Sequence, residues 1–262
     1  MGRDILDLPA PAADARFTYG KDANQFGELR LPPKSDAPHP VVVSIHGGFW
    51  RAAYGLDHMG HACGKLAQAG VATWNLEYRR VGQPGGGWPG TLDDALAGLE
   101  YLKTLAASHP LDLKRVALMG FSAGGHLALW LASKPRAIAL KGVVSLAGVA
   151  DLRRAWELRL GNGAVDDFVG GSPTQFPDRY HVSSPIELLP GGTKTRLVHG
   201  TDDTTVPIEI SERFAHAATA AGLDAKVIPL PGADHFPGMD PRDPEWKITE
   251  SAILEILGVQ RK

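Results

Sequence analysis

A serine lies between two glycines at a point where a strand is expected to pass into a helix. The chain reads Gly-Phe-Ser-Ala-Gly-Gly at 120–125, after a short apolar run and before an apolar stretch of helical character. A serine on so sharp a turn takes a strained conformation, and a side chain at Gly120 or Gly124 would collide with the neighbouring strand or helix. The helix expected over about 126–133 directs its positive end at this turn. This pattern predicts Ser122 as a nucleophile.

A hydroxyl is a weak nucleophile near neutral pH, so it needs a base and a carboxylate that orients the base. His235 lies in a turn-forming segment after the strand expected at 225–230, and we expect it to be the base. Asp203 lies in a loop after the strand expected at 195–199, and we expect it to be the acid.

Two other aspartates compete with Asp203 for the role of the acid. Asp202 is its neighbour in the chain, so its side chain is expected to point elsewhere. Asp151 follows the preceding strand of the expected sheet. We therefore favour Asp203.

A glycine loop upstream could supply the donors for an oxyanion. The β-branched run at 41–45 leads into His-Gly-Gly-Phe-Trp at 46–50, which indicates a buried strand that enters a loop rich in backbone N–H groups. We expect the N–H groups of Gly48, Phe49 and Ala123 to form an oxyanion hole. Loss of one such donor costs about 2.7–4 kcal/mol of transition-state stabilisation.

These four motifs together resemble the α/β-hydrolase superfamily, whose members carry serine, acid and histidine in this chain order. The chain is similar to small esterases near the hormone-sensitive-lipase and acetyl-xylan or feruloyl esterase group. It is also similar to kynurenine formamidase, which has a similar His-Gly-Gly-aromatic-Trp loop. The likeness spans about 41–236. It implies an α/β-hydrolase fold with a mostly parallel central sheet of about eight strands.

The pattern of elements agrees with one domain over 1–262, because strand and helix signals alternate as in a parallel sheet covered on both faces. Antiparallel edge strands are expected near 16–20 and 26–31, a helix near 57–69 and a long helix over about 91–107. The segment 161–192 indicates a short cap inserted between two strands.

Composition excludes several classes of protein. The chain has 262 residues and 44% hydrophobic content, enough for a full core, and its net charge of −2 gives no general attraction to nucleic acid or anionic membranes. Cys63 is the single cysteine, so no intramolecular disulfide is expected. No signal peptide or membrane span is recognisable, and we expect a cytoplasmic protein. The assembly is left open, with a homodimer as one option.

Several aromatic and imidazole side chains near the motifs have two interpretations. Trp50 and Trp88 could form a wall of the substrate pocket, or each could pack its own loop. His46 is expected to brace the oxyanion loop, and His199 is expected to be structural. His58 and His61 could share a helix face, but no third ligand is evident and no metal or other cofactor is expected.

The sequence therefore predicts a carboxylic ester hydrolase that acts on a small ester or formamide through Ser122, His235 and Asp203 and an acyl-enzyme. An arylformamidase that cleaves N-formylkynurenine would use the same groups and is the alternative. A non-catalytic binding protein of the same fold is the second alternative, although none of the three groups is missing here.

Overall fold

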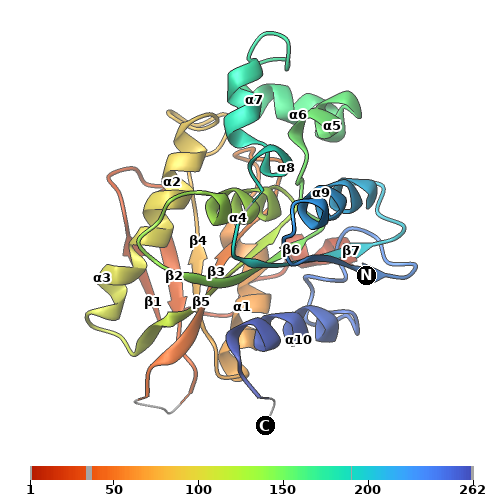
Figure 1. Cartoon of the computed structure of the whole chain (residues 1–262). Helices are drawn as coiled ribbons and strands as arrows, with labels where there is room; N and C mark the ends of the chain where they lie inside the picture. The colour runs from red at the N-terminus through yellow and green to blue at the C-terminus, as the bar shows by residue number, and fades with distance from the viewer. Residues whose placement is uncertain (1, 34–36, 190, 261–262) are drawn as a thin grey trace.

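The computed structural model describes residues 2–33, 37–189 and 191–260 (Figure 1). These residues form a sheet of eight strands in the order β1-β2-β4-β3-β5-β6-β7-β8. The pairs β1–β2 and β2–β4 are antiparallel, and all other pairs are parallel. The strands are β1 (Ala15–Thr18), β2 (Phe26–Arg30), β3 (His39–Ile45), β4 (Ala72–Leu76), β5 (Leu111–Phe121), β6 (Leu140–Leu146), β7 (Lys194–Gly200) and β8 (Ala225–Leu230). The expected α/β-hydrolase fold is confirmed.

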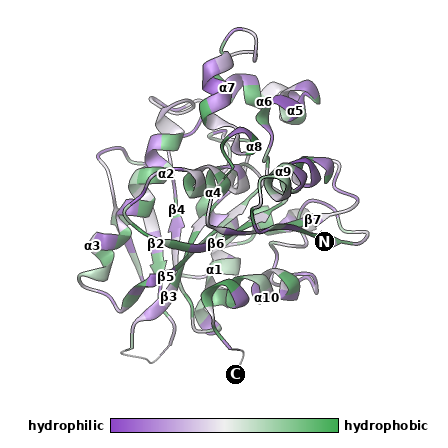
Figure 2. Cartoon of the chain, viewed as in Figure 1, coloured by the Kyte–Doolittle hydropathy of each residue, from purple (hydrophilic) through white to green (hydrophobic). Residues whose placement is uncertain are grey.

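The central strands are buried on both faces, as parallel strands between two helical layers must be. In β3, Val41, Val43 and Ile45 belong to one hydrophobic cluster and Val42 to the other. The first cluster contains residues of α2 (Gly90–Glu100), α3 (Leu102–Ala106), α4 (Ala123–Ser133) and α9 (Glu209–Ala220). The second contains residues of α1 (Gly60–Gln68) and α10 (Trp246–Leu257). Figure 2 shows hydrophobic residues along the sheet and hydrophilic ones on α5 and α9; α5 spans Leu152–Glu157.

Some expected elements differ from the observed ones in length. The helix expected over 91–107 is divided into α2 and α3 at Tyr101. The helix expected near 57–69 begins as a short 3-10 helix, η2 (Leu56–Met59), and continues as α1. The helix after the glycine motif begins directly at Ala123, so its first turn adjoins Ser122.

Four helices lie between β6 and β7, and all but the first of them lie wholly or mostly in the segment 161–192 that was predicted as a cap. They are α5, α6 (Leu160–Val169), α7 (Pro177–Ser183) and α8 (Pro185–Leu188), and α5, α6 and α7 project at the top of Figure 1. The backbone at Gly161, Asn162 and Gly163 is left-handed, so the start of α6 is a left-handed turn. In the described part of the chain, every helix is too short or too polar to cross a bilayer.

Candidate active site

The predicted serine occupies a strained turn between β5 and α4. Ser122 has φ 54° and ψ −117°, and its backbone N–H donates to the carbonyl of Leu146 at 2.8 Å. A Cβ at Gly120 would overlap the carbonyl oxygen of Gly124, and one at Gly124 would overlap the carbonyls of Ile45 and the next residue. The glycines on both sides are therefore required by close backbone approach.

Ser122 is only 2% exposed. It reaches open space through a cavity of about 240 Å³ that His235 also lines. The other residues that line this cavity are Leu6, Gly48, Phe49, Tyr54, His58, Phe121, Thr205 and Phe236. The serine and histidine motifs, which are far apart in the chain, therefore border the same cavity.

His235 is paired with Asp203, and both side chains come from loops that follow neighbouring parallel strands. Nδ1 of His235 lies 2.6 Å from Oδ2 of Asp203. The other carboxylate oxygen, Oδ1, accepts hydrogen bonds from the N–H groups of Thr205 at 2.8 Å and Val206 at 2.9 Å. His199 also contacts Oδ2, through Nε2 at 3.3 Å. The carboxylate is held from several sides and directs one oxygen at the imidazole.

The electrostatics of this pair keep the acid ionised. Burial alone would raise the pKa of Asp203, but hydrogen bonds from His199 and His235 hold that pKa well below its ordinary value. A carboxylate that only accepts hydrogen bonds fixes Nδ1 of His235 as the donor and leaves Nε2 with a lone pair. That tautomer is the one a general base needs.

The competing aspartates have other partners. Asp202 is exposed and accepts a hydrogen bond from the hydroxyl of Thr201 at 2.9 Å. Asp151 caps α5 by accepting from the N–H of Arg154 at 3.0 Å, and its other oxygen accepts from Arg213 at 2.9 Å. Of these three carboxylates, the structure brings Asp203 to His235.

The glycine loop after β3 carries unusual backbone angles beside the serine. Gly48, Phe49 and Trp50 all have positive φ, at 109°, 53° and 56°. Such angles cost about 1–3 kcal/mol at each non-glycine residue and are concentrated at functional sites. Gly48 and Phe49 line the cavity. Ala123 is the first residue of α4, so its N–H has no acceptor within the helix.

His46 braces this loop from below. Its Nε2 lies 2.8 Å from Oε1 of Glu77, and its ring stacks on Tyr78 with centroids 4.3 Å apart. The hydroxyl of Tyr78 donates to the carbonyl of His46 at 2.8 Å. Burial alone would raise the pKa of Glu77, but the charge of His46 and its hydrogen bond lower that pKa. Glu77 and Tyr78 therefore hold the ring and the backbone of His46 in place at the start of the glycine loop.

The expected pocket walls Trp50 and Trp88 are placed elsewhere. Trp50 is 0% exposed, stacks on Phe168 and donates from Nε1 to Nδ1 of His126 at 3.3 Å, so as a pocket wall it was wrong. Trp88 is not among the described residues that line the cavity. Its ring lies under the guanidinium of Arg179, 4.4 Å away. Both indoles therefore pack against residues of the cap, and neither borders the Ser122 cavity.

Six of the residues that line the cavity were not predicted for the site, and three of them lie outside the recognised motifs: Leu6, Tyr54 and His58. His58 accepts a hydrogen bond from the N–H of Gly47 at 3.3 Å, directly behind the oxyanion loop. Its sequence signal was its closeness to the glycine loop, whereas the sequence analysis weighed His58 only as a metal ligand and set that interpretation aside. Leu6 gave no signal at all.

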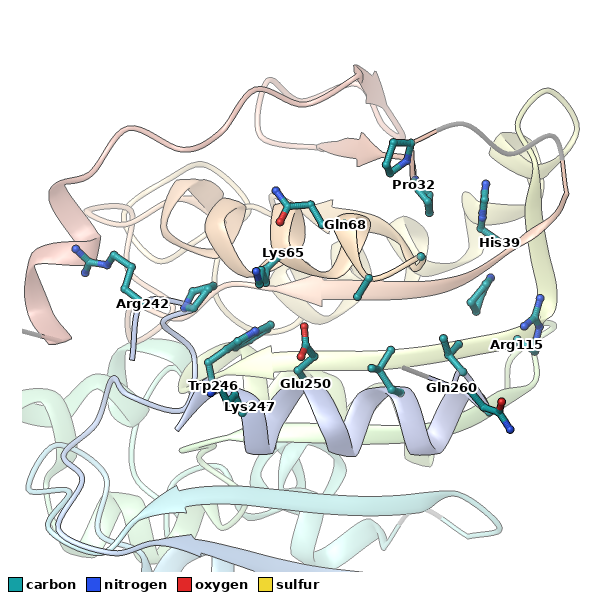
Figure 3. Close-up of a pocket in the computed structure, with 18 of the residues that line it drawn as sticks. Pro32, His39, Lys65, Gln68, Arg115, Arg242, Trp246, Lys247, Glu250 and Gln260 are labelled. Carbon is teal, nitrogen blue, oxygen red and sulfur yellow. The ribbon is translucent and has the colours of Figure 1, made fainter. Parts of the chain in front are cut away.

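A second and larger cavity, of about 1110 Å³, lies between α1 and α10 (Figure 3). Lys65, Trp246 and Glu250 are among the residues that line it. Neither Ser122 nor His235 is among the described residues that border it. Size alone therefore does not identify the site, because the predicted nucleophile and base line the smaller cavity.

Comparison with known proteins places these features in a family. A probable isoprenylcysteine alpha-carbonyl methylesterase of Arabidopsis thaliana is 28% identical in an alignment 254 positions long, which covers 86% of this chain and 51% of that protein. The versiconal hemiacetal acetate esterase of Dothistroma septosporum is 33% identical in an alignment 247 positions long, which covers 84% of this chain and 73% of that protein. The chain thus spans about half the length of the first relative.

Solved structures show the same fold. Esterase B of Lactobacillus rhamnosis matches with a TM-score of 0.80 and 22% identity, over 95% of this chain and 87% of that one. A butyrate-bound esterase of Thermogutta terrifontis matches with a TM-score of 0.77 and 22% identity, over 95% and 94%. The BD-FAE family model matches residues 28–218. The chain therefore belongs to the BD-FAE family, within the α/β-hydrolase superfamily.

Proposed function

We propose that this protein is a serine esterase that hydrolyses small carboxylic esters. The observation that carries the proposal is the 2.6 Å contact of Asp203 with His235, which lines the same cavity as Ser122. A neutral imidazole with its donor nitrogen fixed by a carboxylate is the base that a serine nucleophile needs. The names of the relatives, a methylesterase and an acetate esterase, support the same chemistry.

In the first half of the proposed reaction, Oγ of Ser122 attacks the ester carbonyl while its proton passes to Nε2 of His235. Asp203 stabilises the resulting imidazolium. The N–H groups of Gly48, Phe49 and Ala123 hold the tetrahedral oxyanion. Because these donors are backbone groups in a buried site, they need no reorganisation as charge develops.

In the second half, the tetrahedral intermediate collapses and the bond to the alcohol oxygen breaks. His235 gives its proton to the departing alcohol, which leaves an acyl group on Ser122. Water then attacks the acyl-enzyme, His235 takes the proton of that water, and the acid is released when the proton returns to Oγ of Ser122. No step needs an oxidant or a metal.

The size of the cavity supports small substrates. Pockets that enclose drug-sized ligands measure about 300–1,000 Å³, and this one measures about 240 Å³. Its lining is largely aromatic, from Phe49, Tyr54, Phe121 and Phe236. A short apolar group fits such a space, and a bulky or charged one would lose its hydration without gaining a partner.

The test of the proposal is turnover of short-chain p-nitrophenyl esters by the wild type and Ser122→Ala. We expect kcat to fall by roughly 10⁴-fold or more, with the unfolding midpoint preserved. Ser133→Ala, at the far end of the same helix, is the matched control and should keep wild-type kcat. Rapid labelling of the wild type, but not of Ser122→Ala, by a fluorophosphonate probe would support an activated serine and exclude a mere binding protein.

Rates on N-formylkynurenine and on acetylated or feruloylated sugars complete the panel. The same three groups could cleave a formamide, whose formyl group demands only a small pocket. A formamide rate above every ester rate would replace the ester proposal by the arylformamidase alternative. We further propose a cytoplasmic location, in keeping with the single, buried Cys63 and the absence of a disulfide among the described residues.

A further inference from the structure

One wall of the active cavity comes from the N-terminal part of the chain, far in sequence from every catalytic motif. Leu6 lines the cavity together with Ser122 and His235. It lies in a short 3-10 helix, η1 (Gly2–Asp7). Leu6 is the one aliphatic side chain among the described residues of this lining.

The apolar anchor of this turn is the neighbouring residue Ile5. Its side chain is 0% exposed and belongs to the hydrophobic cluster on the α1 and α10 face of the sheet, with Met59 and Phe121. Full burial of an isoleucine side chain contributes about 1.5–3 kcal/mol. This burial fixes η1 against the body of the protein, so Leu6 has a defined position.

An ionic clamp joins η1 to the loop that carries His235. Asp4 accepts two hydrogen bonds from the guanidinium of Arg242, both at 3.0 Å. The same guanidinium is held by Asp240, with contacts of 2.5–3.0 Å, and Asp240 is 1% exposed. Asp4 and Arg242 are partly exposed, so the pair adds little free energy. Its two-point geometry instead fixes the orientation of the turn beside the His235 loop.

The aromatic walls of the cavity are supported by other contacts. The ring centroid of Phe121 lies 4.8 Å from that of His235 and 5.7 Å from that of Phe236. Phe49 is packed against Gly161. Replacement of these rings would disturb the catalytic groups themselves. Leu6 is half-buried and lies on a short segment that carries none of the catalytic groups, so its size can be changed without altering the catalytic loops.

We propose that Leu6 is a specificity-determining residue that limits the length of the substrate group bound in this cavity. The inference rests on the proposed esterase function and deepens it. The substrate class is an ester in which the enclosed group is apolar and only a few carbons long. Each methylene that such a pocket admits or rejects changes kcat/KM by about 10- to 200-fold.

The experiment compares Leu6→Ala and Leu6→Trp with the wild type on two series of esters. One series lengthens the acid from acetate to octanoate with p-nitrophenol as the alcohol, and the other lengthens the alcohol of acetate esters. In the series whose variable group enters the cavity, Leu6→Ala should raise the ratio of long-chain to short-chain kcat/KM by about tenfold or more. Leu6→Trp should lower that ratio.

Leu113→Ala is the matched control, because Leu113 is another half-buried leucine and lies on β5 away from the cavity. It should leave both ratios unchanged. If Ser122-dependent hydrolysis persists and neither Leu6 variant changes either ratio, the role of Leu6 is overturned while the esterase function stands. If the wild type hydrolyses no ester in a Ser122-dependent way, the proposed function itself has failed.

Discussion

At the scale of single residues, His58 has the clearest supporting role for the oxyanion loop. Its Nε2 accepts the N–H of Gly47 at 3.3 Å, and its ring meets those of His46 and Phe121 edge-on, at 5.8 and 6.0 Å. Burial lowers the pKa of His58 to about 3, so the ring is neutral near pH 7 and its Nε2 lone pair is available. The hydrogen bond therefore orients the peptide between His46 and Gly47, one residue before the donor expected at Gly48.

His58→Phe tests this role because it keeps a ring and removes the acceptor. A buried N–H without a partner costs about 1–3 kcal/mol, so the loop should relax and kcat should fall by roughly tenfold or more, with KM little changed. His58→Gln, whose amide oxygen can accept, should recover part of kcat. Steady-state kinetics on p-nitrophenyl acetate measure both.

His61→Phe is the control for His58→Phe, since His61 lies on the same helical segment but does not line the cavity. It should retain wild-type kcat. An unchanged kcat in His58→Phe would show that the contact with Gly47 does not position the oxyanion loop.

At the scale of elements, the left-handed turn at the start of α6 packs against Phe49, which lines the cavity. Gly161 has φ 57°, and a Cβ there would lie 2.7 Å from Cδ1 of Phe49. Gly163, in the same turn, has φ 83°, and a Cβ there would lie 3.4 Å from an oxygen of Asp166 and 3.9 Å from a nitrogen of Arg159, both at the ends of flexible side chains. The predicted cap segment thus contacts the oxyanion loop at Gly161, beside Phe49, as well as through the stacking of Phe168 on Trp50.

The pair Gly161→Ala and Gly163→Ala separates backbone strain from displacement of Phe49. Each alanine in a left-handed conformation costs about 1–2 kcal/mol, so both variants should unfold at lower urea concentration. Only Gly161→Ala should also move the ring of Phe49 and reduce kcat/KM, by severalfold or more. Equal kcat/KM in the two variants would show that the turn does not determine the position of Phe49 in the cavity.

Elements also show where prediction from the sequence reached its limit. The strands at 41–45, 225–230 and near 195–199 could be predicted because apolar runs were bounded by turn residues. The division at Tyr101 could not, because its dihedrals remain helical (φ −63°, ψ −18°) and no residue there breaks a helix. Local pattern predicts the existence of an element better than its ends.

At the scale of the whole molecule, the parallel sheet explains why three distant motifs could be assigned to one site. Ser122, Asp203 and His235 each follow a strand, and the carboxyl ends of parallel strands meet at one edge. Leu6 could not be assigned in this way, because Ile5 and Arg242 hold it by tertiary contacts that leave no local pattern.

A buried histidine links three parts of the molecule and makes its stability depend on pH. Nδ1 of His126, on α4, accepts from Trp50 of the oxyanion loop at 3.3 Å. Its Nε2 donates to the carbonyl of Ser183 in the cap at 2.9 Å. Burial lowers the pKa of His126 to about 4, although the hydrogen bond to Ser183 acts in the opposite direction.

The sign of the pH effect follows from the lowered pKa. Between the ordinary histidine pKa of about 6.5 and the folded value of about 4, the unfolded chain binds the proton and the folded one does not. The contribution of His126 to the free energy of unfolding is therefore complete above about pH 6.5. It decreases as pH falls below that value, by up to about 1.4 kcal/mol per pH unit. The lowered pKa of Asp203 acts only at more acidic pH, below its ordinary value of 3.8.

Urea unfolding at pH 7, 6 and 5 tests this linkage in the wild type and in His126→Gln. Gln can replace parts of both hydrogen bonds but does not titrate, so the variant should lose stability less steeply between pH 6 and 5. The difference in slope should be about 1 kcal/mol per pH unit. His216→Gln, which makes the same change at an exposed position on α9, should keep the wild-type slope. If the free energy of unfolding falls equally with pH in His126→Gln and in the wild type, His126 is not the group that stays unprotonated in the folded protein. The contact between the oxyanion loop and the cap then does not require a neutral imidazole.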